Sequence, residues 1–183
     1  MKRMMSALAI GVSLLCVCFS LTACWFWGGY NKIMYDYFSN ENNYYTWTVT
    51  VKDFVWTDAD NDYTAYSMYE NSENFEHRAL EKRKYMYISL SATILEYEKE
   101  WMDYIKETAF EIHYENAVEL IENGFLENVS IGDTITIRAT HCTYSDANFL
   151  YVAAVEKDGV VYLDMQTGLK NITEYMDGRR SLL

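Results

Sequence analysis

The sequence of 183 residues contains no proline. Average usage of about 5 % would give roughly nine prolines in a chain of this length. Their absence excludes proline-rich linkers and the polyproline segments that dock into aromatic grooves. The length suits one domain that can bury a sizeable core.

Basic residues are also few, with 15 Lys and Arg against 27 Asp and Glu and a net charge of −12. Such a surface repels phosphate backbones, so nucleic acid is excluded as a class of partner. It also disfavours electrostatic attraction to anionic lipid. The single basic cluster, residues 81–84, is typical of a solvated loop or helix end.

Motifs for catalysis and metal binding are missing or incomplete. There is no Gly-x-Ser-x-Gly elbow and no glycine-rich phosphate loop. Residues 58–62 open like a calcium loop, but its sixth and twelfth positions hold Tyr in place of Gly and Glu. His113, His141 and Cys142 could approach one another only if their strands pair, and zinc would still need a fourth ligand. We therefore predict no catalytic residue, no metal site and no cofactor.

The N-terminus carries a targeting signal. Lys2 and Arg3 precede an uncharged run over residues 4–23, which is the layout of a secretory signal peptide. The run ends in Leu21-Thr22-Ala23-Cys24, which resembles the lipobox of bacterial lipoproteins. The resemblance implies that residues 1–23 are removed as a signal peptide and that Cys24 receives acyl chains such as palmitate. It also implies a cell-membrane location on the extracytoplasmic face.

An uncleaved transmembrane helix is the alternative, because residues 4–27 are long and apolar enough to span a bilayer. Cleavage would leave 13 basic and 27 acidic residues, a net charge of −14. The acyl chains on Cys24 would then have to keep the protein at the membrane. Cys16 and Cys18 would leave with the signal peptide. Cys142 would then be the only free thiol, and no intramolecular disulfide would be possible.

Hydrophobic periodicity predicts the secondary structure of the remaining chain. Residues 24–43 are predicted to be a lipidated tether. Period-2 alternation predicts strands over 44–56, 63–69 and 86–94. A helix is expected after the third strand, although one long helix over 74–107 competes, because neither Gly nor Pro interrupts it.

The last third of the chain gives the clearest pattern. We expect a strand over 109–113, a helix over 114–123 with Ala117, Val118 and Ile121 inward, and a strand over 134–140. Residues 149–156 and 160–163 flank Lys157-Asp158-Gly159 and predict a hairpin, because Gly accepts the positive φ of the turn. Residues 177–183 are predicted to be a frayed tail.

This order of elements resembles an OB-fold-like barrel with a helix between its third and fourth strands. The stretch 124–137 also looks like a segment of small secreted lipoproteins of uncharacterised function. The resemblance implies an α+β, β-rich domain over 44–176, in which residues 74–107 would be a partly helical insertion.

Aromatic residues make up 16 % of the chain and are the remaining candidates for a site. Rings exposed on a barrel can hold a glycan or an extended peptide, whereas buried rings pack the sheet. The candidate binding aromatics are Tyr63, Tyr66, Tyr69, Tyr85 and Tyr87. We expect a non-catalytic binding or structural module for an envelope protein or glycan. The alternative is a hydrolase acting on envelope material, with His113 or His141 beside a carboxylate of perturbed pKa.

Overall fold

The computed structural model describes residues 32–58, 64–71, 86–97, 107–144 and 147–181, with side chains for 32–57, 65–71, 88–96, 109–140 and 150–177. Within these residues seven strands form one sheet. The strands are β1 (Tyr44–Asp58), β2 (Thr64–Ser67), β3 (Met86–Tyr97), β4 (Glu107–Ile112), β5 (Thr134–Tyr144), β6 (Ala147–Lys157) and β7 (Val160–Leu163). The helices are η1 (Glu41–Asn43), α3 (Tyr114–Glu122), α4 (Phe125–Asn128) and α5 (Met165–Ser181), and residues 32–38 and 68–71 are helical as well.

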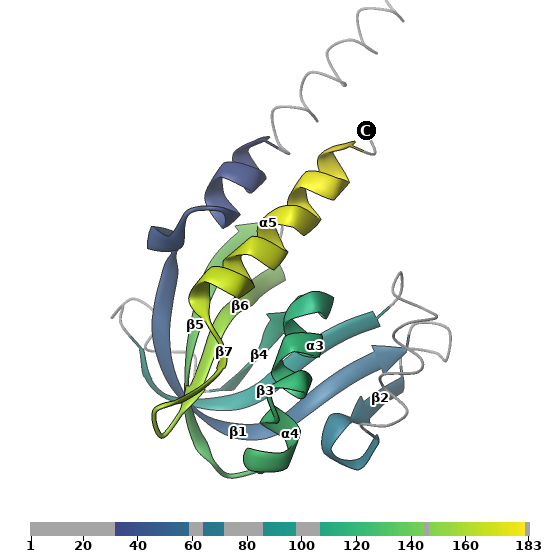
Figure 1. The fold of residues 1–183 in the computed structure, drawn as a ribbon, viewed down its shortest axis with the longest axis vertical. Helices are drawn as coiled ribbons and strands as arrows, with labels where there is room; N and C mark the ends of the chain where they lie inside the picture. Colours follow the sequence, from purple (N-terminus) through teal and green to yellow (C-terminus); the bar gives the residue numbers. More distant parts are fainter. Residues whose placement is uncertain (1–31, 59–63, 72–85, 98–106, 145–146, 182–183) are drawn as a thin grey trace, which may run out of the picture.

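The sheet closes on itself. From β1 the neighbours follow in the order β3, β4, β6 and β5, and β5 pairs with β1 again. Among the pairs in this circuit only β4 with β6 is parallel. β2 adds to the last residues of β1, and β7 adds to the end of β6. The fold is therefore α+β and strand-rich, with a closed but uneven sheet (Figure 1).

A bulge in β1 bends the first strand across this circuit. The buried side chains of β1 from Trp47 onward are those of Trp47, Val49, Val51, Phe54 and Trp56. They change from odd to even positions where the register with β3 shifts, between Val51 and Asp53. The extra residue at this point, Lys52, shifts the alternation by one position, so that even-numbered side chains of β1 point into the core after the bulge. The alternation in the sequence predicted the strand but not this shift.

The main core lies inside the closed sheet, and α3 and α4 contribute to it. The Trp47 and Phe110 rings meet edge to face at 5.6 Å, and Phe125 of α4 meets Phe54 at 5.5 Å. From α3, Ala117 and Leu120 are fully buried.

The inner face of α3 differs from the predicted one, because Val118 and Ile121 are only half-buried, whereas Asn116 is fully buried. Burial of Asn116 is possible because its Nδ2 donates to the carbonyl oxygens of Val152 at 3.1 Å and Gly168 at 3.2 Å. Asn171 of α5 in turn donates to the Asn116 side-chain oxygen at 2.9 Å. A hydrophobicity pattern gives no weight to such a polar contact.

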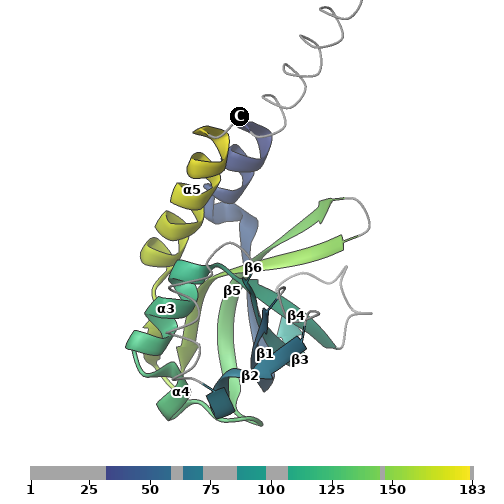
Figure 2. The same ribbon diagram turned by 90° about the vertical axis from the view of Figure 1, so that its right-hand side faces the viewer.

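A second, smaller core joins helical residues 32–38 to α5 and β6. Phe38, Tyr44, Ala153 and Ile172 are its buried members. The Tyr44 hydroxyl donates to the Phe38 carbonyl oxygen at 2.8 Å. Figure 2 shows this short helix beside α5. Within the predicted tether over 24–43, Met34, Tyr37 and Phe38 pack against the domain, so this part of the segment is not a free tether.

The strand predicted over 86–94 is confirmed as part of β3, and this corrects two other predictions. β3 pairs with β1 on one side and β4 on the other, so residues 86–97 are a central strand of the sheet and not part of an insertion. The single long helix over 74–107 is wrong for the same reason. The helix predicted after β3 falls on residues 98–106, which lie outside the described part of the chain.

The C-terminal third follows the prediction closely. β5 buries Ile135, Ile137 and Ala139, and the β6–β7 turn has positive φ at Asp158 and Gly159. The predicted tail differs, because α5 continues to Ser181. Among the described helices none is both long and apolar enough to cross a bilayer.

Candidate functional site

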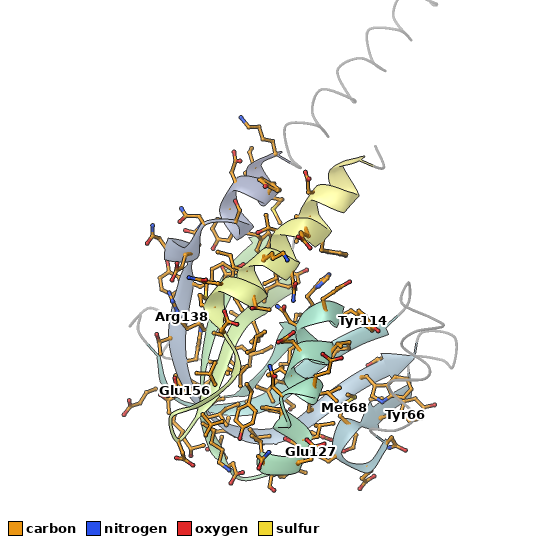
Figure 3. All side chains as sticks on the ribbon, viewed as in Figure 1. Tyr66, Met68, Tyr114, Glu127, Arg138 and Glu156 are labelled. Atoms are coloured by element: carbon orange, nitrogen blue, oxygen red, sulfur yellow. The ribbon has the colours of Figure 1, made fainter. Side chains whose placement is uncertain are left out.

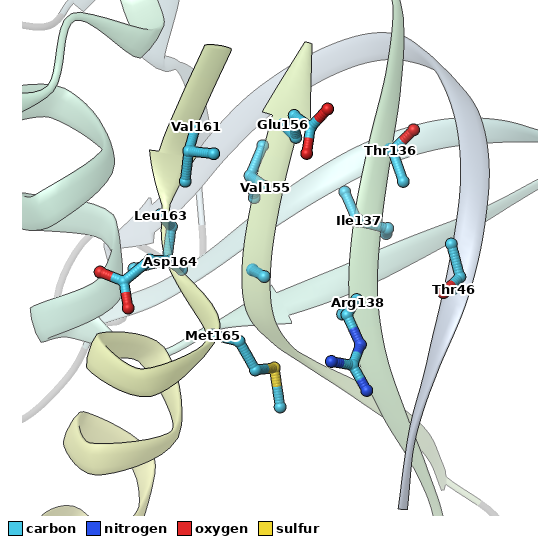
Figure 4. Close-up of a pocket in the computed structure, with 11 residues that line it drawn as sticks. Thr46, Thr136, Ile137, Arg138, Val155, Glu156, Val161, Leu163, Asp164 and Met165 are labelled. Atoms are coloured by element: carbon cyan, nitrogen blue, oxygen red, sulfur yellow. The ribbon is translucent and has the colours of Figure 1, made fainter. Parts of the chain in front are cut away.

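The candidate site is a groove on the outer face of the sheet, where β1, β5, β6 and β7 meet the start of α5. Its volume is about 320 Å³. It is lined by Thr46, Thr136, Ile137, Arg138, Ala154, Val155, Glu156, Val161, Leu163, Asp164 and Met165. Figure 4 shows that these residues extend from the start of α5 across β7, β6 and β5 to β1. The volume lies at the lower end of the range for ligand sites, which suits a short segment or a single group.

Strand alternation produces the groove. Ile135, Ile137 and Ala139 of β5 point into the core, so Thr136 and Arg138 must point to the opposite face. β6 pairs with β5 so that Glu156 lies opposite Thr136. The tight turn at Asp158-Gly159 then folds β7 back along β6 and brings Val161 to the rim.

Arg138 is held in place at one side of the groove. Its Nη1 lies 2.9 Å from Glu41 Oε1, and its Nη2 donates to the Tyr44 carbonyl oxygen at 3.3 Å. Both partners belong to the segment where the chain enters β1. These two contacts fix the orientation of the Arg138 guanidinium, and about a third of the Arg138 side chain is still exposed.

Asp164 lies at the opposite side, directly before α5, and caps the first turn of that helix. Its Oδ1 accepts from the backbone N–H groups of Gln166 and Thr167 at 3.0 and 2.9 Å. The Thr167 hydroxyl donates to Oδ2 at 2.6 Å. These hydrogen bonds favour the ionised carboxyl and lower the pKa of Asp164. Asp164 thus carries a fixed negative charge at neutral pH.

The groups in the groove lining that could take part in chemistry are the hydroxyls of Thr46 and Thr136 and the carboxylates of Glu156 and Asp164. The charged groups in its lining are the guanidinium of Arg138 and the carboxylates of Glu156 and Asp164, and Ala154 and Met165 add apolar surface. No Cys, Ser or His lines it, and no aromatic ring does. This arrangement suits a ligand with separated charges and small apolar groups.

The predicted aromatic residues lie elsewhere. Tyr66 is half-buried and stacks on Trp56, with ring centroids 4.4 Å apart. Burial, followed by the charges of Asp53 and Asp133, raises the pKa of Tyr69. Figure 3 shows Tyr66 on the opposite side of the domain from Arg138 and Glu156. Tyr63 and Tyr85 lie outside the described residues, and the structure describes only the backbone of Tyr87 within β3.

His113 lies at the junction of β4 and α3, away from the groove lining. Its Nδ1 is 2.8 Å from Glu115 Oε2, and its ring is 4.3 Å from that of Tyr175 on α5. Burial lowers the pKa of His113, and the nearby Glu115 carboxylate offsets part of that effect. Burial also raises the pKa of Glu111, which precedes His113 by two residues.

The strands that carry His113 and His141 do not pair. β4 and β5 both pair with β6, which separates them. The side chains of His141 and Cys142 are not among those described. Among the described residues, no group of three or more His, Cys, Asp or Glu side chains could hold a metal ion. Cys24 and residues 60–62 lie outside the described part of the chain.

Comparison with known proteins adds no family. The chain matches no protein-family model, no curated protein and no solved structure. The sequence did not predict the groove, because its polar lining residues on the strands are ordinary outward positions. Asp164 was the one local signal, since Asp is a preferred residue at the start of a helix.

Proposed function

We propose that this chain is a lipid-anchored, extracytoplasmic binding module, and that the groove holds an extended polypeptide segment of an envelope protein. The lipobox-like Leu21-Thr22-Ala23-Cys24 supports the anchor. The observation that carries the binding role is the groove itself, whose lining combines Arg138, Glu156 and Asp164 with small apolar side chains. A polypeptide presents both charged and small apolar groups. A glycan would gain little, because the groove offers no ring on which a sugar could stack.

We also propose that the sheet is an OB-like barrel. Its circuit β1, β3, β4, β6, β5 and back to β1 gives the order first, second, third, fifth and fourth strand. The parallel pair joins the third and fifth of these strands, and α3 lies between the third and fourth. OB-folds commonly bind ligands on their second and third strands. The groove lies on other strands, so its use would be a departure from that pattern.

Photo-crosslinking tests the groove in cells. A photoreactive residue at Thr136 should yield a discrete, protease-sensitive adduct. The same residue at Thr134 should not, because Thr134 is also exposed on β5 but does not line the groove. Equal adducts from both positions would exclude the groove as the site.

Two further variants separate binding from structure. Arg138→Gln removes the guanidinium from the groove, and Glu41→Gln breaks the same ion pair but leaves the guanidinium in place. We expect the Thr136 adduct to decrease severalfold in Arg138→Gln and to persist in Glu41→Gln. An equal loss in both variants would mean that the ion pair only supports the fold.

The second candidate function is a hydrolase acting on envelope material. The observation in its favour is the contact between His113 and Glu115, with Glu111 of raised pKa nearby in sequence. Against it, Tyr175 packs on the His113 ring, and none of these residues lines the groove. If an activity were found, unchanged turnover after replacement of both His113 and His141 would exclude them as catalysts.

A further inference from the structure

Two helices extend from the same end of the barrel. Figures 1 and 2 both show residues 32–38 and α5 side by side, with residue 32 and the end of α5 pointing the same way. Phe38 and Ile172 join them in the second core, together with Met34 and Met176. We call the outer ends of these two helices, residues 32–35 and 176–181, the helical end.

The length of chain before residue 32 restricts where a membrane can be. Seven residues lie between Cys24 and Lys32, so eight steps along the chain join them, and at about 3.6 Å per step a fully extended chain spans at most roughly 29 Å. α5 alone is about 25 Å long at 1.5 Å per residue. If Cys24 carries the lipid, as the proposed function requires, the helical end is the part of the domain that the anchor holds nearest to the bilayer.

Charge is distributed to match this placement. Residues 32–38 and 165–181 contain four basic and three acidic residues, a net charge of +1. The rest of the chain from Cys24 onward contains nine basic and 24 acidic residues, a net charge of −15. The helical end itself contains Lys32, Arg179 and Arg180 against Asp177, a net charge of +2. An anionic lipid surface would attract this charge and repel the rest of the domain.

One exposed apolar side chain, that of Ile33, also lies at the helical end. Ile33 is 67 % exposed, the largest exposure among the large hydrophobic residues that the structure describes as exposed. It follows Lys32 directly. A basic residue next to an exposed apolar one is suited to the headgroup region of a bilayer, where both can be satisfied.

We propose that the helical end docks on the anionic lipid surface beside the lipid anchor, so that the barrel and its groove point away from the membrane. The proposal rests on the proposed anchoring at Cys24. It assigns a docking role to the ends of two helices that the binding role does not use. The overall charge of the chain had argued against any electrostatic attraction to lipid, and the local charge of the helical end reverses that expectation.

The test is a depth measurement on the full lipidated protein in vesicles. Cys142→Ser removes the free thiol, and a fluorophore is attached at Asp177→Cys or, as a control, at Glu127→Cys on α4. Both positions are exposed. Vesicles contain phosphatidylcholine alone or mixed with phosphatidylglycerol, and a lipid with a nitroxide headgroup quenches nearby fluorophores.

We expect quenching at Asp177 but not at Glu127, stronger with phosphatidylglycerol and weaker in about 1 M salt, where the Debye length is near 3 Å. Arg180→Glu should lower the ratio of docked to undocked protein at least about fivefold. Lys52→Glu, the same charge change on β1, should leave the ratio unchanged.

Other results would overturn the proposal. Vesicle-bound protein with equal quenching at Asp177 and Glu127 would refute docking while the anchor stands. Protein that stays out of the vesicle fraction with no quenching at either position would refute the docking and the anchor together. Dimers in detergent that shield the Asp177 label would assign the helical end to a second copy of the chain.

Discussion

At the scale of single residues, burial decides more than chemical type. Asn116 is fully buried and hydrogen-bonded to β6 and α5, whereas Ile33 is two-thirds exposed. His113 shows the same principle in a titrating group, because its ring is enclosed between Glu115 and Tyr175. Its neutral form is therefore favoured in the folded chain.

The lowered pKa of His113 predicts a loss of stability in mild acid. The unfolded chain takes up a proton near pH 6.5, whereas the folded chain does so only at a lower pH. The unfolded state then binds more protons, so the free energy of unfolding falls as the pH drops below 6.5 towards the folded pKa. Urea unfolding at pH 7 and pH 5 measures this.

His113→Gln should make that decrease smaller, because no proton is then taken up at this position. His141→Gln is the matched control. If His113 is responsible, this variant should show the same decrease in the free energy of unfolding between pH 7 and pH 5 as the wild type. An equal decrease in the free energy of unfolding in His113→Gln and in the wild type would show that other groups cause the acid sensitivity.

At the scale of elements, α5 lies directly against β6 at Gly168. A Cβ added at Gly168 would lie 2.0 Å from the Ala153 carbonyl oxygen. Gly168 is therefore the residue that lets α5 lie directly on the sheet, and the Asn116 amide bonds both of these elements. The contact also positions Asp164, which caps the first turn of α5 and lies at one side of the groove.

Gly168→Ala should destabilise the protein by about 1–3 kcal/mol, because the helix must move off the strand. Helix propensity alone predicts the opposite sign, a gain of about 1 kcal/mol. Gly168→Val should cost more than Gly168→Ala. Denaturant unfolding decides the sign, and a more stable Gly168→Ala variant would mean that α5 does not touch β6 at this point.

The sequence predicted strands well where period-2 alternation was long, as in β1, β3 and β5. It failed where a contact distant in sequence decides the outcome. The bulge at Lys52, the buried Asn116 and the packing of Phe38 each depend on partners from other elements. The groove could not be predicted, since it exists only once β5, β6 and β7 are side by side.

At the scale of the whole molecule, the packed structure begins well before β1. Phe38 is fully buried against Ile172 and Tyr151, with the Phe38 and Tyr151 rings 5.0 Å apart. The helix over residues 32–38 is thus packed onto the closed sheet and α5. Only eight residues, 24–31, precede this helix from the predicted lipidation site onward. Because this stretch is short, anchoring at Cys24 would also orient the groove.

Phe38→Ala should destabilise the domain by about 3–5 kcal/mol, as expected for a fully buried ring. Ile33→Ala, five residues earlier in the same helix and exposed, should change stability by less than about 0.5 kcal/mol. Thermal and urea unfolding of both variants measures the difference. Equal, small effects would show that residues 32–38 behave as a tether after all.

Both proposals depend on Cys24, and the intact mass of the protein extracted from cell membranes tests it most directly. We predict a chain that begins at Cys24 and carries at least two acyl chains, because one chain alone binds a bilayer only marginally. In Cys24→Ser the acylated species should be absent from the membrane fraction. A membrane-bound species with the mass of the full 183 residues would contradict the lipid anchor and establish the uncleaved helix.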